Sequence, residues 1–390
     1  MNTLKFIGKL FIRELKLISG DGSIILTIFI APILYIFLLG SIYNKKDIIE
    51  IPLTVIDMDQ TSLSRMFIRF IDATQKVEVV KQVNNIDEGK LEIDKMNSFG
   101  LVYIPKGFEK KINLMEGADI SLLLNNTRFL MSNEINKTVN RVAIEMGAGI
   151  RIKYFAEQGV QPRLARKMVM PLEPNVHFVY NIFNNYGFFL IPGLLLLILQ
   201  QTLFIGLGES VSLEREEKKL SGWLSQKHSI LAAIVGKNIF YLFLYLAYFL
   251  LLFVVIFPYF HIQNKGEFLP VFILVFLFII AIILFTNIIA SFFKKEIFYM
   301  EVIAFTTYPI FLITGYSWPT YALPVFHKYV AMLLPTTPFF RSVIKITQEG
   351  SSVQFISKDL ILLLVQILFF YLLLVWRLSW LKRSKNGNSE

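Results

Sequence analysis

The chain has 390 residues, of which 55% are hydrophobic and only 17% are charged, and its formal net charge is +10. An average soluble domain carries about 25% charged residues, and a soluble globule of this length could not bury so much apolar surface. The composition therefore indicates an integral membrane protein and excludes a soluble enzyme fold for the whole chain. Because the chain has no cysteine, disulfides and thiolate metal sites are excluded as well.

The positive charge is distributed as a topology signal rather than as a nucleic-acid-binding face. Residues 44–187 hold 19 basic and 17 acidic residues, whereas the remainder holds 20 and 12, mostly beside apolar segments. Lys and Arg in the short flanks of membrane spans set the orientation of those spans. We therefore expect membrane lipids, and no nucleic acid, among the partners of this chain.

Residues 1–22 indicate an amphipathic helix that lies in the membrane interface. Basic side chains follow one face at a helical spacing and apolar side chains follow another: Lys5, Lys9, Arg13 and Lys16 on the first, and Leu4, Ile7, Phe11, Leu15 and Ile18 on the second. A basic amphipathic helix beside a membrane span is typical of an interfacial helix. The alternative is an ordinary flank whose basic side chains snorkel to the headgroups.

Six apolar segments near the length of a membrane-spanning helix follow this helix. They are residues 23–43, 188–208, 238–257, 268–293, 302–316 and 359–376, of which the fifth is the shortest. The first segment has no small-residue cleavage site, so we interpret it as a retained anchor rather than a signal peptide. The pattern predicts an α-helical polytopic membrane protein with about six transmembrane helices.

The orientation follows from the basic residues in the short flanks. If the N-terminus is cytoplasmic, the inner segments 1–22, 209–237, 294–301 and 377–390 hold 15 basic residues, against 5 in the short outer segments. This asymmetry predicts that both termini are cytoplasmic, with a polar tail over 377–390, in the inner (cytoplasmic) membrane of the cell. Residues 44–187 are then extracytoplasmic.

Residues 44–187 alternate strand and helix signals and predict an inserted α/β domain. Four apolar or β-branched runs predict strands at 53–56, 77–80, 99–104 and 120–124, with a long helix near 135–150. Thr61 or Ser62 is placed to cap the helix that follows the first strand. Asp57 and Asp59 are able to bind a cation, but we favour a structural role, because Asp is common where a strand ends and a helix begins.

Nucleotide-binding and catalytic motifs are absent from the sequence. Gly236-Lys237 lacks the upstream glycine of a phosphate-binding loop and is followed by Asn238, and His177, His228, His261 and His327 form no metal-ligand pattern. The interiors of the predicted spans hold almost no charge, which disfavours an ion-coupled relay. We therefore expect no enzyme activity and no bound cofactor in this chain, and any transport would need energy from another subunit that docks on the cytoplasmic side.

The segment 209–237 offers a docking surface of this kind, because a charged stretch is followed by an apolar step and a return to the membrane. This segment resembles the coupling hairpin in the permease subunit of ABC-2-type ABC exporters. Glu214-Arg215-Glu216 match the acidic-basic stretch of that family, and Trp223-Leu224 match the apolar step after it. The chain differs where the family often has Gly-Thr and Pro, since Lys218-Lys219 and Lys227-His228 stand there.

Three further stretches support the resemblance. Arg13-Glu14 with the Asp21-Gly22 break resembles the N-terminal pattern of the family, and the C-terminal pattern is matched by Gly315, Pro319, Pro324, Pro335 and Pro338. The insert resembles the subgroup with a large extracytoplasmic domain between spans one and two, because Asp57 to Arg65 and Ile104 to Phe108 follow the strand and helix pattern of that subgroup.

The resemblance implies the partners of this chain and the residues that meet them. It implies contact with ABC ATPase subunits that bind ATP and Mg, and pairing with a second permease, identical or a sister chain. The ATPase-coupling residues would be Arg13, Glu14, Glu214, Arg215, Glu216, Trp223 and Leu224. The exterior domain would receive the cargo or an outer partner protein.

Two other groups of residues have predicted roles in transport. The prolines of the segment 314–356 prevent a straight span, so we expect a re-entrant outer gate around Gly315, Pro319, Pro324, Pro335 and Pro338. Polar residues of spans two and three either line a path for an amphipathic substrate or hydrogen-bond between helices: Gln200, Gln201, Tyr241, Tyr245 and Tyr248.

The sequence thus favours an ATP-driven exporter permease that moves a hydrophobic or amphipathic substrate. One alternative is a membrane-anchored structural or receptor-like protein that acts through its exterior domain. A membrane-embedded transferase is a further alternative, disfavoured because acid and base residues are missing from the spans.

Overall fold

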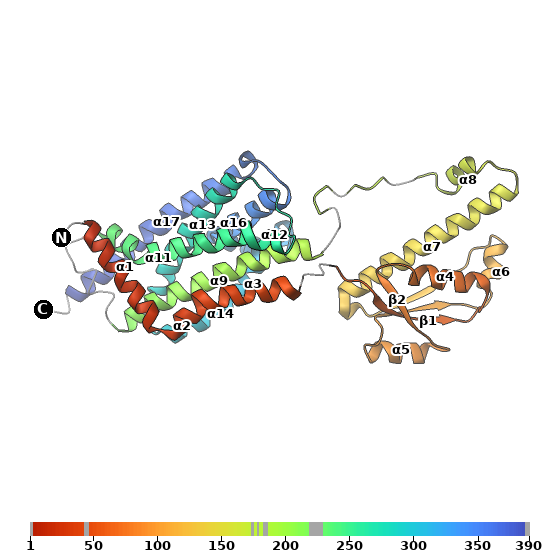
Figure 1. Cartoon of the computed structure of the whole chain (residues 1–390), viewed down its shortest axis with the longest axis horizontal. Coiled ribbons are helices and arrows are strands. Elements are labelled where there is room, and N and C mark those ends of the chain that lie inside the picture. Colours follow the sequence, from red (N-terminus) through yellow and green to blue (C-terminus); the bar gives the residue numbers. More distant parts are fainter. Residues whose placement is uncertain are drawn as a thin grey trace. The chain divides into compact units, whose positions relative to one another are not determined.

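The computed structural model describes residues 3–42, 47–172, 175–177, 179–181, 186–217 and 229–386, and Figure 1 shows the path of the chain. The chain forms two compact units. Residues 1–46 and 178–390 make the helical unit, and residues 47–177 make the sheet unit. The predicted fold class is confirmed, because six helices are long and apolar enough to cross a membrane and a four-stranded α/β unit lies between the first and second of them.

The six candidate spans differ from the sequence prediction mainly at their ends. They cover Gly22–Ile42 (α2, η1 and α3), Tyr186–Glu216 (α9), Ile230–Tyr259 (α11, η3 and α12), Phe268–Ala290 (α13), Glu296–Ile313 (α14) and Val353–Arg383 (within α17, Val353–Asn386). Span two therefore continues eight residues past Gly208, and span five begins at Glu296 rather than at residue 302. The charged residues 209–216 are the last turns of α9, and the predicted tail at 377–390 begins inside α17.

Helix α1 (Thr3–Gly20) packs on the helical unit through a face other than the predicted apolar one. Its buried side chains are Phe6, Leu10, Glu14 and Ile18, whereas Leu4 is exposed. The acidic Glu14 stands in this buried row where an apolar residue would be expected, because its partners lie on α9 and α11. Asp21 ends α1 and caps α2, because its carboxylate accepts the backbone N–H groups of Ser23 at 2.8 Å and Ile24 at 3.3 Å.

An irregular stretch of short helices joins α14 to α17. The elements are η4 (Thr320–Ala322), α15 (Val325–Leu333), α16 (Thr336–Val343) and η5 (Ile344–Gln348). Gly315 adopts φ +89, a conformation that L side chains rarely take, and this residue ends span five.

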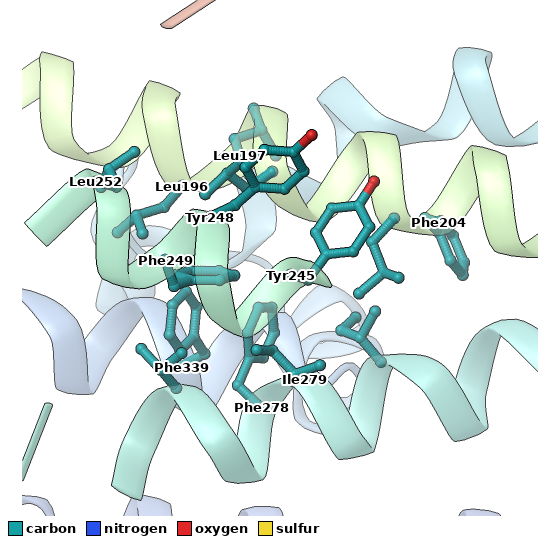
Figure 2. Close-up of a cluster of buried hydrophobic side chains, with 14 of the residues drawn as sticks. Leu196, Leu197, Phe204, Tyr245, Tyr248, Phe249, Leu252, Phe278, Ile279 and Phe339 are labelled. Atoms are coloured by element: carbon teal, nitrogen blue, oxygen red, sulfur yellow. The ribbon is translucent and has the colours of Figure 1, made fainter. Parts of the chain in front are cut away.

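Aromatic packing forms the core of the helical unit around α11, α13 and α16. Phe278 and Phe339 stack with ring centroids 3.7 Å apart, and Phe249 meets both of them edge-on. Figure 2 shows this group beside Leu196 and Leu197 of α9. Such pairs stabilise a fold beyond the area that they bury, and they fix α16 against the spans.

The sheet unit has three layers. Its strands run in the order β2 (Val77–Gln82), β1 (Ile51–Asp57), β3 (Gly100–Ile104) and β4 (Ser121–Leu124), with β1 parallel to β2 and to β3, and β4 antiparallel to β3. Helices α4 (Ser62–Asp72) and α7 (Phe129–Glu157) cover one face, and α5 (Ile86–Asp94) covers the other (Figure 1). Helices α6 (Phe108–Asn113) and α8 (Pro162–Val169) complete the unit, of which α8 was not predicted from the sequence.

Asp59 joins the end of β1 to the start of α6. Its carboxylate accepts backbone N–H groups from Gly107 at 2.6 Å, Phe108 at 3.1 Å and Glu109 at 2.9 Å, and the Thr61 hydroxyl at 2.8 Å. Thr61 caps α4 as predicted. These bonds satisfy donors that a helix start leaves unpaired, so they support the structural role that the sequence favoured for Asp59.

The substitution Asp59→Asn is expected to destabilise the sheet unit. Burial alone would raise the pKa of Asp59, but the hydrogen bonds outweigh burial and hold the pKa below its ordinary value. The stabilisation is thus complete above the ordinary pKa of an aspartate and is lost as the pH falls through the lower folded pKa. At neutral pH we expect the free energy of unfolding of the sheet unit to fall by about 1–2 kcal/mol. This loss corresponds to a roughly five- to thirtyfold rise in the rate of amide exchange.

Hydrogen exchange of the full chain, read by mass spectrometry over β1, β3 and α6, measures this effect. The exposed Asp119, changed to Asn, is the matched control and should leave exchange unchanged. Equal exchange in the two variants would show that Asp59 does not stabilise the unit.

Candidate functional site

Four charged side chains from three helices meet in a buried cluster, here called the charge network. Its members are Arg13 and Glu14 of α1, Glu214 of α9 and Lys237 of α11. The Lys237 Nζ atom lies 2.8 Å from Glu14 Oε2 and 3.3 Å from Glu214 Oε2, and Arg13 forms an ion pair with Glu214. The side chains of Glu14, Glu214 and Lys237 are 2%, 0% and 4% exposed. Two positive and two negative charges therefore balance inside the unit.

Polar side chains complete the charge network. Lys237 donates to the Ser210 hydroxyl at 2.8 Å, Ser210 donates to Glu14, and the Tyr241 hydroxyl donates to Glu14 at 3.0 Å. The Lys237 ammonium thus has an oxygen partner for each of its three protons. Ser210 and Glu214 are four residues apart on α9, as are Lys237 and Tyr241 on α11, so each pair shares one helix face.

The charge network explains the position of α1. A buried ion pair offsets its desolvation cost only when its geometry is good and its remaining atoms are hydrogen-bonded. Glu14 meets this condition only with α1 against α9 and α11, because Ser210, Lys237 and Tyr241 all lie there. The network therefore defines one docked position for α1, which apolar contacts alone would leave open.

The two residues after Glu214 have different partners at the same end of the helical unit. Arg215 donates to the backbone carbonyls of Ser291 and, at 3.1 Å, of Phe293, and the carboxylate of Glu216 accepts the backbone N–H of Glu296 at 3.0 Å. Arg377 of α17 also donates to the Ser291 carbonyl, at 3.1 Å. The turn between α13 and α14 is thus held by α9 and α17 together.

The structure corrects the expectation that the spans hold almost no charge. Glu209, Glu214 and Lys237 all lie within the helices of candidate spans, and their side chains are buried. The sequence predicted that span two ends at Gly208 and span three begins at Asn238, which places these charges in the cytoplasmic coupling hairpin 209–237. The available signal was the four-residue spacing of Ser210 and Glu214, which places polar groups on one face of a continuing helix. Lys237 was not selected from the sequence as a site residue.

The remaining predicted coupling residues, Trp223 and Leu224, lie outside the described residues. They fall in the segment 218–228 between α9 and α11. Their contact with a partner therefore stays a prediction. The described chain shows only that α9 leads into this segment two residues after Glu216, and that α11 leaves it at Ile230.

The polar residues of spans two and three make contacts between helices. Tyr248 donates to the backbone carbonyl of Ile28 at 2.9 Å, Gln201 accepts from Thr307, and Gln200 is buried. Figure 2 shows Tyr245 and Tyr248 among apolar side chains of α9 and α13. Tyr241, Tyr248 and Gln201 thus form hydrogen bonds between helices. Gln200 Oε1 and the Tyr245 hydroxyl are buried without a hydrogen-bond partner among the described residues, so a role of these residues in a substrate path stays a prediction.

The residues of the predicted gate lie around the short helices at the opposite ends of α9 and α14 from the charge network. Pro319 precedes η4, Pro324 precedes α15 and Pro335 precedes α16, while Pro338 is buried within α16. Gly315 is followed by Tyr316, whose ring stacks on Phe189 and whose hydroxyl donates to the Phe189 carbonyl at 2.6 Å. The irregular segment is therefore fastened to the start of α9.

Comparison with known proteins identifies one family. A protein-family model described as ABC-2 family transporter protein matches residues 22–376. The matched stretch runs from the start of the first candidate span into α17 and includes both units. No curated protein matches the chain.

Removal of the buried ammonium is expected to destabilise the helical unit. Lys237→Met leaves Glu14 and Glu214 with only Arg13 to balance them, and breaking a buried ion pair in this way costs about 3–5 kcal/mol. Lys237→Met combined with Glu14→Gln removes one charge of each sign, so its loss should be smaller than the sum of the single losses. Thermal unfolding of the full chain in detergent measures the loss of stability in the two single variants, Lys237→Met and Glu14→Gln, and in the double variant.

The exposed Lys9 of α1, changed to Met, serves as the control and should leave the midpoint of unfolding unchanged. Strict additivity of the two single losses would show that Lys237 and Glu14 do not interact.

Proposed function

The chain belongs to the ABC-2 family of transporter proteins, and from this premise we propose that it is the permease of an ATP-driven exporter for a hydrophobic or amphipathic substrate. As a membrane permease of this family it is not itself catalytic and relies on a partner ATPase. In our proposal ATP and Mg are bound by that partner. The large insert between spans one and two would place the chain in the subgroup with an extracytoplasmic domain.

The charge network is the observation that supports the coupling part of this proposal. Glu214 and Lys237 stand on the two helices that flank residues 218–228, and both bind α1. A force applied to this segment by an ATPase therefore acts on α1, α9 and α11 together. In our proposal Trp223 and Leu224 provide the apolar contact with the ATPase, and Arg13, Glu14 and Glu214 position the helices that carry this contact.

Arg215 and Glu216 extend the same connection to the turn between α13 and α14. Their partners are the carbonyls of Ser291 and Phe293 and the backbone N–H of Glu296. We propose that motion of α9 reaches spans four and five through these contacts. The resemblance to the family further supports a second permease, identical or a sister chain, as a partner. The substrate path would open between the two permeases.

We assign the irregular segment around Gly315, Pro319, Pro324, Pro335 and Pro338 to the outer gate. Non-helical backbone at membrane depth requires protein or water around it, and Tyr316 and Phe339 pack it against α9 and α13. The sheet unit would then receive the cargo or an outer partner protein. The apolar and aromatic character of spans two to four supports a lipid-like or amphipathic cargo.

The coupling proposal predicts that Trp223→Ala combined with Leu224→Ala weakens binding of the ATPase. Truncating a buried aromatic contact typically costs more than 2 kcal/mol, so we expect at least a roughly tenfold fall in co-purified ATPase and in ATP hydrolysis in lipid. Trp376→Ala is the matched control, because Trp376 is 61% exposed on α17. Wild-type protein that binds no ABC ATPase, or a double variant that binds it normally, would contradict the proposal.

The proposed orientation, with cytoplasmic termini and an extracytoplasmic sheet unit, predicts which single-cysteine variants react with a membrane-impermeant maleimide in intact cells. Because the chain has no cysteine, Lys110→Cys at an exposed position of α6 and Arg383→Cys at an exposed position of α17 report one site each. We expect Lys110→Cys to react in intact cells and Arg383→Cys to react only after permeabilisation. The reverse pattern would invert the proposed topology.

A further inference from the structure

Three carboxylates from separate segments converge beside the charge network. They belong to Asp21 at the corner between α1 and α2, to Glu209 of α9 and to Glu296 at the start of α14. One carboxylate oxygen of each residue lies within 4.8 Å of those of the other two. We call these three residues the carboxylate cluster. Among the residues that the structure describes, no basic side chain forms an ion pair with any of the three.

Glu209 is the member whose state needs an explanation. Its side chain is fully buried, and both carboxylate oxygens lack a hydrogen-bond partner in the described structure. The side chains of Ser23 and Glu296 lie close to this carboxylate, although neither meets its oxygens in hydrogen-bond geometry. A buried anion without partners costs several kcal/mol, and Asp21 and Glu296 add negative charge beside it. A cation bound between the three carboxylates would offset this cost.

From this convergence we infer that Asp21, Glu209 and Glu296 form a binding site for one divalent metal cation of the Mg²⁺ or Ca²⁺ type. Hard cations of this kind take carboxylate, carbonyl, hydroxyl and water oxygens at about 2.0–2.6 Å. Two ligands of one ion therefore lie no more than about 5 Å apart, which the spacing of the three carboxylates satisfies. An all-oxygen donor set favours these ions over zinc or copper.

The neighbouring contacts hold the three carboxylates in position. Asp21 is fixed because it caps α2, and Glu296 is fixed because its backbone N–H donates to Glu216 of α9. Asp21 and Glu296 are only partly buried, so water has access to complete the coordination of an ion. A bound ion would tie the corner between α1 and α2 to spans two and five. This inference does not depend on an ATPase, and it can fail while the proposed function stands.

Binding of Mn²⁺ tests the site directly. It is measured by EPR, because the signal of free Mn²⁺ is lost when the ion binds. The experiment uses the full chain, purified in detergent and stripped with EDTA. We expect about one Mn²⁺ per chain, displaced by Mg²⁺ or Ca²⁺ but not by K⁺ at equal ionic strength. Glu209→Gln and Asp21→Asn should each weaken binding at least about tenfold. Asn also caps helices well, so Asp21→Asn removes the charge while keeping α2.

Glu301→Gln is the matched control, because Glu301 is exposed on α14 one and a half turns from Glu296, and it should bind as wild type does. A second readout is amide exchange over residues 21–24 and 296–299, which the ion should slow in wild type and in Glu301→Gln but not in the other two variants. Wild-type protein that binds no Mn²⁺ would show that protons neutralise the cluster, and the inference would be wrong. Unchanged binding in both Glu209→Gln and Asp21→Asn would overturn it equally.

Discussion

Burial of the Lys237 ammonium is the constraint on which the arrangement of the helical unit depends. An ammonium away from water must find oxygen partners, and those partners come from α1 and α9. This requirement determines why α9 continues past the apolar stretch to Glu214, and why α1 lies against the spans with an acidic residue in its buried row. The polar ends of three helices thus form a single unit, from which the segment 218–228 departs and to which it returns.

The two groups of charges at this end of the molecule differ in balance. In the charge network, two acids face two bases, and serine and tyrosine hydroxyls supply the remaining hydrogen bonds. In the carboxylate cluster, three acids converge without a described basic partner. The first arrangement is complete within the chain, whereas the second requires a positive ligand from outside the chain. Both groups have a member on α9, with Glu214 in the charge network and Glu209 in the carboxylate cluster.

The sequence predicted the architecture well, because its main signals are local. Apolar length identified the six spans, and alternation with helix caps identified the sheet unit, including Thr61 as one of two candidates for the cap of α4. The site was predicted less completely, because the partners of Glu14 lie 196 to 227 residues away in the sequence. Hydropathy also ends a span at its first charge, so Glu209 and Lys237 were predicted to lie in the cytoplasmic coupling hairpin rather than in the spans. Only tertiary structure shows that both side chains are buried, Lys237 with oxygen partners and Glu209 without a hydrogen-bond partner among the described residues.

The long separation between Glu14 and its partners has a consequence for biosynthesis. Helix α1 is made before its partners, because Ser210 lies in span two and Lys237 in span three, and both follow the sheet unit in the chain. During that interval Glu14 has no ammonium to pair with and must stay in contact with water. An amphipathic α1 resting at the headgroup layer satisfies this need, because its basic face holds it there until span three arrives. Assembly of the docked helix is therefore a late step, and a nascent chain stopped before residue 237 would have α1 undocked.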